Sequence, residues 1–148
     1  LFNLCSPNSA YFGKKDAQQL WLIKQMIKSM KYPIQIVECE TLREKSGVAM
    51  SSRNNLLNKD LRLRASIVCK SLYKAKKMFL KGELGSQNIK EFIREFISKD
   101  SGFSIDYVSI VNLKTFKECT KELRPNHKYL ASVAVYANNV RLIDNIEL

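Results

Sequence analysis

Histidines, long apolar runs and paired cysteines are what this sequence has least of. His127 is the only histidine among 148 residues, and in the loop expected after Pro125-Asn126 it is a weak candidate for acid–base catalysis. No apolar run approaches the ~20 residues of a membrane helix, and no charged-then-apolar leader ends in small residues. The four cysteines have neither C-x-x-C spacing nor histidine partners: Cys5, Cys39, Cys69 and Cys119. This pattern argues against zinc and favours buried free thiols, so we expect a soluble cytoplasmic protein.

Negative charge is also scarce, because 14 Asp and Glu face 25 Lys and Arg, which gives a net charge of +11. Much of the excess lies in five lysines, Lys70, Lys74, Lys76, Lys77 and Lys81. Apolar residues recur there every three or four positions and predict one amphipathic helix with the lysines on its solvated side: Leu61, Ala65, Val68, Leu72, Ala75 and Phe79. We favour this reading over a nucleic-acid groove, because no helix-turn-helix, RNP or zinc-finger pattern accompanies the charge.

The first 40 residues have the pattern of a β-α-β unit. Residues 10–12 form a short apolar run that predicts a strand, followed by a turn at Gly13-Lys14-Lys15 and a helix with Asp16 at its N-cap. The core stripe of that helix is expected at Leu20, Ile23, Ile27 and Met30. Lys31-Tyr32-Pro33 ends the helix, and residues 34–39 read as the next strand, so the two strands should be parallel.

The pattern changes after residue 40. A polar loop and the basic helix are followed by a break at Gly82 to Gly85, then by a helix over 86–99 with an apolar stripe at Ile89, Phe92, Ile93, Phe96 and Ile97. Three strands are predicted over 105–111, 129–137 and 140–146, the last two joined by Asn138-Asn139 in a type I′ turn. We therefore predict an α/β chain. Residues 1–40 are the tail of a Rossmann-like domain, and residues 41–148 form a small α+β domain of helices on a three-stranded antiparallel sheet.

Two polar segments suggest a nucleotide site. In the first, Gly13 and two lysines precede a helix start, where unpaired backbone N–H groups favour an anion. In the second, residues 47–54 supply hydroxyls and a guanidinium. Point charge, forked donors and rotatable hydroxyls together suit the oxygens of a triphosphate.

These segments resemble motifs of the pantothenate synthetase family. Residues 11–19 are similar to its Y-x-G-x-K-D-x-Q-Q segment, and residues 43–54 to its R-E-x-x-G-L-A-M-S-S-R-N segment. Residues 141–145, Arg-Leu-Ile-Asp-Asn, match a third motif, in which we expect Arg141, Asp144 and Asn145 to tie the terminal strand to its neighbours. Three motifs in the family's order are more specific than a lone glycine loop.

The resemblance implies condensation of pantoate with β-alanine, driven by ATP through an enzyme-bound pantoyl adenylate. It implies ATP contacts from Gly13, Lys14, Lys15, Asp16, Leu42, Met50, Ser51, Ser52 and Arg53, a pantoate contact from Gln19, and a possible Mg²⁺ contact from Asp16. Lys15, Ser51, Ser52 and Arg53 would carry the catalytic charge stabilisation. Local alternatives stay open: a solvated turn lysine for Lys14, and a D-x-x-Q capping box for Asp16 and Gln19.

The family also carries an upstream half with an H-x-G-H motif, which this sequence lacks. The chain starts at Leu1 rather than Met, so we expect a C-terminal portion whose second part acts as a lid over ATP and which is inactive by itself. The intact enzyme would be a homodimer. The alternatives are an assembly module without catalysis of its own and, less favoured, a basic nucleic-acid-binding domain.

Overall fold

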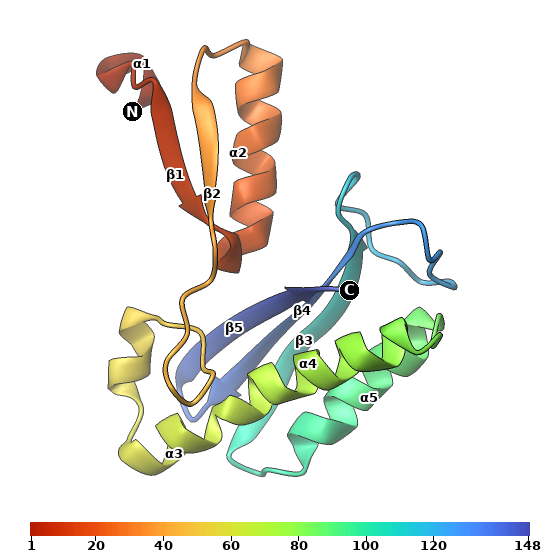
Figure 1. Ribbon diagram of the computed structural model, residues 1–148. Coiled ribbons are helices and arrows are strands. Elements are labelled where there is room, and N and C mark those ends of the chain that lie inside the picture. Colours follow the sequence, from red (N-terminus) through yellow and green to blue (C-terminus); the bar gives the residue numbers. More distant parts are fainter. The chain divides into compact units, whose positions relative to one another are not determined.

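The computed structural model describes residues 1–148 and divides into two compact units, Leu1–Thr41 and Leu42–Leu148. The division falls one residue after the predicted domain boundary. No helix in either unit is both long enough and apolar enough to cross a membrane. The predicted fold class is confirmed: a β-α-β unit is followed by helices on a three-stranded antiparallel sheet (Figure 1).

The first unit is the predicted β-α-β arrangement with a short helix before it. Its elements are α1 (Phe2–Cys5), β1 (Ser9–Gly13), the 3₁₀ helix η1 (Lys14–Asp16), α2 (Ala17–Met30) and β2 (Gln35–Cys39). Strands β1 and β2 are parallel, in register from Ser9 opposite Gln35 to Gly13 opposite Cys39. Helix α2 ends where Lys31 takes the left-handed conformation with φ 54° and donates its N–H to the Ile27 carbonyl, a common way to stop a helix.

One expectation for this unit is confirmed only in part, and two are wrong. Asp16 lies at the N-cap of α2, but its side chain makes no capping hydrogen bond, because η1 leaves it at ψ 60° rather than in the extended conformation of a capping residue. Met30 is 59% exposed at the last turn of α2, beyond the reach of the short strands, and therefore does not extend the core stripe. Cys5 and Cys39 are free, as expected, but exposed, because each lies at the end of an element.

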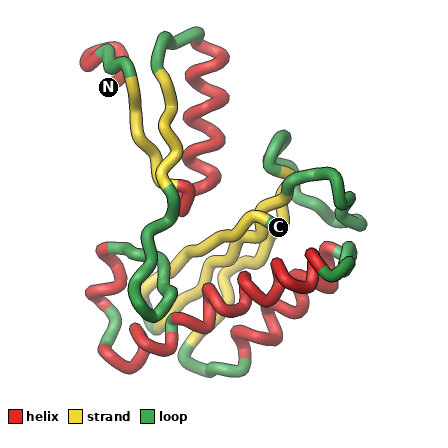
Figure 2. Tube along the Cα trace, in the orientation of Figure 1, coloured by secondary structure: helices red, strands yellow, loops and turns green.

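The second unit packs two antiparallel helices against one face of its sheet (Figures 1 and 2). Its elements are η2 (Ser52–Leu56), α3 (Lys59–Arg64), α4 (Ser66–Leu80), α5 (Ser86–Ser98), β3 (Phe103–Asn112), β4 (Tyr129–Ala137) and β5 (Val140–Glu147). The sheet order is β3-β4-β5, and both pairs are antiparallel. The core lies between helices and sheet, where the α5 stripe of Ile89, Ile93 and Ile97 is fully buried.

The predicted single basic helix is two helices, α3 and α4. Ala65 ends α3 and begins α4 at ψ −15°, and the Val68 N–H donates to the Ala65 carbonyl over 3.1 Å, the tighter i+3 pattern of a 3₁₀ turn. Leu61 before the break and Val68 after it are both 4% exposed, so the break keeps both apolar faces on one core. Four of the five lysines are exposed and Lys76 is half-buried, as their helical positions require.

The two-residue hairpin between β4 and β5 is confirmed, since Ala137 pairs with Val140. Its predicted turn type is wrong. Asn138 has a φ of 53°, but Asn139 does not take a positive φ, whereas a type I′ turn needs positive φ at both positions. Asparagine accepts this conformation at Asn138 because its short polar side chain can bond locally.

The core of the second unit gives the first prediction. Leu72 on α4 is 1% exposed and Leu63 on α3 is 68% exposed. We expect Leu72→Ala to lower the free energy of unfolding by about 2–5 kcal/mol, because it leaves a cavity, whereas the identical change at Leu63 should stay within about 0.5 kcal/mol. Urea unfolding of both variants measures the difference, and equal losses would contradict the placement of the core.

Candidate functional site

The first candidate segment lies at the carboxyl end of β1, the edge at which parallel sheets bind ligands. Gly13, η1 and the first turn of α2 bring together the predicted Gly13, Lys14, Lys15, Asp16 and Gln19. The Gly13 backbone is extended, with φ −73° and ψ 134°, and an added Cβ would meet no atom within 4 Å. Neither backbone conformation nor packing therefore requires a glycine at this position.

The charged side chains of this segment differ in their exposure and in their ion pairing. Lys14 forms an ion pair with Glu40, which follows β2, so its ammonium already has a carboxylate partner. Lys15 is half-buried, while Asp16 and Gln19 are exposed at the start of α2. Because Asp16 does not cap the helix, the capping box that could explain Asp16 and Gln19 without a ligand is not formed.

The second candidate segment is a tight hairpin, residues 42–50, which leads into η2. Arg43 and Ala49 pair across it, and the Met50 N–H donates to the Leu42 carbonyl over 2.8 Å. At its tip the Gly47 N–H donates to the Glu44 carbonyl over 2.8 Å. Gly47 has φ 91°, and an added Cβ would lie 2.9 Å from Cys69 Sγ on α4, so the tip packs where only glycine fits. Burial raises the pKa of the Cys69 thiol, which favours its protonated form.

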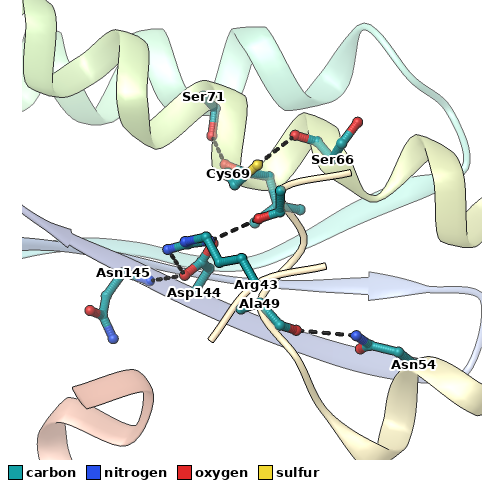
Figure 3. Close-up of polar contacts among 10 residues, drawn as sticks. Arg43, Ala49, Asn54, Ser66, Cys69, Ser71, Asp144 and Asn145 are labelled. Atoms are coloured by element: carbon teal, nitrogen blue, oxygen red, sulfur yellow. Dashed lines mark hydrogen bonds and ion pairs between the residues drawn. The ribbon is translucent and has the colours of Figure 1, made fainter. Parts of the chain in front are cut away.

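Arg43 joins this hairpin to the last strand (Figure 3). Its guanidinium donates to both carboxylate oxygens of Asp144 on β5, over 2.6 and 2.9 Å, and to the Gly47 carbonyl over 3.0 Å. The guanidinium also lies 5.7 Å from the ring centroid of Tyr73 on α4. Its hydrogen bonds with Asp144 raise the pKa of Arg43 above its ordinary value. Arg43 is therefore held by contacts within the second unit.

A second polar cluster holds the exit of the hairpin. The Asn54 amide donates to Glu44 Oε1 over 2.8 Å and to the Ala49 carbonyl over 3.1 Å, and Asn54 is 1% exposed. Arg62 on α3 donates to both oxygens of Glu44, over 3.0 and 3.2 Å. The hydrogen bonds from Arg62, and then the one from Asn54, lower the pKa of Glu44. Both charged residues at the start of the motif, Arg43 and Glu44, are thus neutralised inside the second unit.

The remaining residues of the motif are presented outward. Ser51 accepts the Arg53 N–H over 3.3 Å at the start of η2, while Ser52 and Arg53 are exposed. Leu42 and Met50 are also exposed, 71% and 54%. The five ATP contacts predicted in the second unit therefore lie at the base of the hairpin and on the segment that follows it: Leu42, Met50, Ser51, Ser52 and Arg53.

Sequence reasoning gave no role to Arg43, Glu44, Asn54 or Arg62. The first three belong to the quoted motif, which was the available signal, whereas nothing in the sequence marks Arg62. In the third motif, Arg141 pairs with Asp106 of β3 over 2.9 Å, so this tie reaches the far outer strand rather than the neighbouring strand β4. Asp144 makes its tie to the hairpin instead. His127 is exposed before β4, with Nδ1 3.4 Å from the Tyr129 hydroxyl.

Comparison with known proteins assigns the family. A family model described as pantoate-β-alanine ligase matches residues 1–147, so the chain belongs to this family. It is 42% identical over 146 residues to the pantothenate synthetase of Caldicellulosiruptor saccharolyticus, and this alignment covers 99% of this chain and 51% of the relative. It is 43% identical over 148 residues to the pantothenate synthetase of a Sulfurihydrogenibium species, and this alignment covers 99% of this chain and 52% of the relative.

Solved structures give the same family. Pantothenate synthetase from Thermus thermophilus superposes with a TM-score of 0.88 at 30% identity, over 98% of this chain and 51% of that one. A pantoate-β-alanine ligase from Francisella tularensis, complexed with β-γ ATP and β-alanine, matches with a TM-score of 0.57 at 26% identity, over 98% of this chain and 45% of that one. The chain therefore spans about half the length of the relatives it matches.

Gly47 gives the second prediction. Gly47→Ala should destabilise the second unit by more than the about 1–2 kcal/mol that a left-handed residue costs, because the new methyl group also displaces Cys69. Gly82→Ala is the matched control, since Gly82 has φ 99° but open space around the added Cβ. Thermal unfolding of both variants measures the difference. An equal loss at both sites would contradict the close packing of Gly47 on Cys69.

The third prediction concerns pH. The pKa of Glu44 is lowered in the folded state, so its ion pair contributes stability above the ordinary glutamate pKa of about 4.3 and loses it as pH falls further. Glu44→Gln should therefore be less stable than the native chain at pH 7, and the difference should shrink below about pH 4. Urea unfolding from pH 7 to 3 tests this, with exposed Glu95→Gln as the control. A difference that does not change with pH would contradict it.

Proposed function

We propose that this chain is the C-terminal part of an enzyme that condenses pantoate with β-alanine, using ATP, through a pantoyl adenylate intermediate. The observation that carries the proposal is the division within the motif 43–54. The side chains of Arg43, Glu44 and Asn54 form hydrogen bonds within the second unit. Ser52 and Arg53, in contrast, are exposed, and Ser51 lies beside them. Hydroxyls and a forked cation on a braced loop are suited to polyphosphate oxygens.

The proposed reaction needs no protein nucleophile. A carboxylate oxygen of pantoate attacks the α-phosphorus of ATP, the bond from that phosphorus to the bridging oxygen breaks, and pyrophosphate leaves. The amine of β-alanine then attacks the acyl carbon of the adenylate and expels AMP. The protein's task is to align the reactants and to stabilise negative charge on the phosphates. We assign that task to Lys15, Ser51, Ser52 and Arg53.

The first unit supplies the other proposed contacts. Glycine at position 13 is not required by the chain's own packing, which fits close approach of a phosphate to the backbone. Asp16 and Gln19, freed from a capping role, would contact ATP and pantoate respectively. Lys14 has Glu40 as its partner and would add only a peripheral charge to the ATP site. Leu42 and Met50 would border the nucleotide.

Magnesium is proposed as the companion of ATP. No cluster of three or more His, Cys, Asp or Glu side chains that could hold a metal ion occurs in the chain. Mg²⁺ bound to a nucleotide usually needs only one or two carboxylates besides phosphates and water. The carboxylate of Asp16 is exposed and makes no capping hydrogen bond, so it fits that requirement and would orient the ion when it is bound.

A second candidate function is that of a partner module without catalysis of its own. The chain's coverage of about half of its relatives, 51% for the first of them, favours this reading. The two functions differ in whether turnover appears when an upstream half is supplied. A homodimer and a cytoplasmic location for the intact enzyme remain predictions of the family resemblance.

The fourth prediction tests the proposed function. Pantoate-dependent exchange of labelled pyrophosphate into ATP should appear when this chain is combined with the N-terminal half of a relative. In that assembly, Lys15→Ala and Arg53→Ala should each lower the exchange rate about a hundredfold to a thousandfold, because each removes charge stabilisation. Arg53→Lys should not restore the rate, since lysine lacks the fork.

Lys45→Ala is the matched control, because Lys45 is an exposed cation in the same hairpin that has no proposed contact. Exchange near the unsubstituted rate in both Lys15→Ala and Arg53→Ala would remove the site assignment. No exchange by the unsubstituted assembly, with folding verified by circular dichroism, would reject the proposed function.

A further inference from the structure

Asp144 is a charged residue in an apolar row of the sheet. Alternate residues of β5 face the helices, and the core-facing row reads Val140, Leu142, Asp144 and Ile146. Asp144 lies opposite Val133, which is fully buried, and is itself only 4% exposed. A carboxylate at such a position costs stability unless it is paired and hydrogen-bonded.

The compensation comes from a segment 101 residues away in sequence. Arg43 occupies both carboxylate oxygens, and the Asn145 N–H donates to Oδ1 over 2.8 Å. Through the same guanidinium Arg43 holds the Gly47 carbonyl, and through its strand pairing it meets Ala49, next to Met50. The hairpin cannot leave β5 without leaving a buried carboxylate unpaired, which is more costly than the loss of a surface ion pair.

We propose that the Arg43–Asp144 ion pair is a latch that fixes hairpin 42–50 on β5 and thereby positions Ser51, Ser52 and Arg53 for the phosphates of ATP. Both partners are positioning residues, because they bind each other inside the second unit. This inference rests on the proposed function for its phosphate ligand, whereas the latching of the hairpin rests on the geometry alone.

The same sheet offers a matched control. Arg141 and Asp106 form another Arg–Asp pair on β5 and β3, but their side chains are 38% and 35% exposed and they join only the two outer strands. Asp144→Asn and Asp106→Asn are therefore the same chemical change, but only Asp144→Asn alters a residue that is bonded to the hairpin. Arg43→Lys keeps the charge of the latch but removes its fork, and serves as the second variant if Asp144→Asn folds poorly.

The first experiment measures amide hydrogen exchange in this 148-residue chain. Asp144→Asn should speed exchange of the Gly47 and Met50 amides at least tenfold, because both donate within the hairpin, and should leave the amides of the central strand β4 unchanged. Asp106→Asn should leave the hairpin amides unchanged. Unchanged exchange at Gly47 and Met50, or the same acceleration in hairpin and β4 alike, would overturn the latch.

The second experiment measures pyrophosphate exchange kinetics in the chain combined with an upstream half. Asp144→Asn and Arg43→Lys should each lower kcat/KM for ATP at least tenfold, leave the KM for pantoate unchanged, and show no further loss when combined, because they remove the same latch. A loosened hairpin with unaltered kcat/KM for ATP would overturn the positioning role while leaving the proposed function intact. An inactive unsubstituted assembly would instead reject the phosphate ligand, and amide exchange would still decide whether the hairpin is latched.

Discussion

The second unit is organised around one unfavourable placement, a carboxylate in the apolar row of its last strand. Asp144 is tolerable there because Arg43 supplies a complete fork of hydrogen bonds to it and the Asn145 N–H adds another. A buried ion pair seldom adds net stability compared with well-packed apolar residues, and its best-attested use is to specify one arrangement among several. Here the specified arrangement is the position of a hairpin that has a glycine tip and buries only Val48 and Ala49 of its apolar side chains.

That constraint divides a single sequence motif into an internal framework and an exposed segment. The half-buried charged residues of motif 43–54, Arg43 and Glu44, are neutralised by partners from β5 and α3. Their rigid anchoring leaves Ser52 and Arg53 exposed on a short helical turn. Preorganised donors stabilise developing charge better than mobile ones, because no reorganisation is needed when the charge appears. Under the proposed function, this framework would therefore affect the reaction rate without contacting a substrate.

Periodicity in the sequence predicted most of the fold. It could not predict the roles of side chains whose partners are distant in the sequence. The stripe of Ile89, Ile93 and Ile97 located α5, because that pattern follows directly from which side of the helix faces the core. The three strands were also predicted, although the central strand β4 is buried on both faces and does not alternate. The break at Ala65 keeps the apolar stripe continuous and so leaves no trace in the pattern. In the candidate site, motif letters located residues 50–53, but the roles of Arg43 and Arg62 depend on partners that only the folded chain brings near. Asp144 was a further visible signal, because it is a charge among alternating apolar residues.

The two units differ in what holds them together, and this bears on how the candidate site could form. The first unit buries only Leu20 and Ile34 among its apolar residues, while Leu4 and Tyr11 are 88% and 70% exposed. A pair of strands with one long helix and two short ones provides too little apolar burial to offset the conformational entropy of about 40 ordered residues. Further protein surface over its apolar side chains would supply that burial. Any protein surface that covered these side chains would therefore stabilise the segment that carries Lys15.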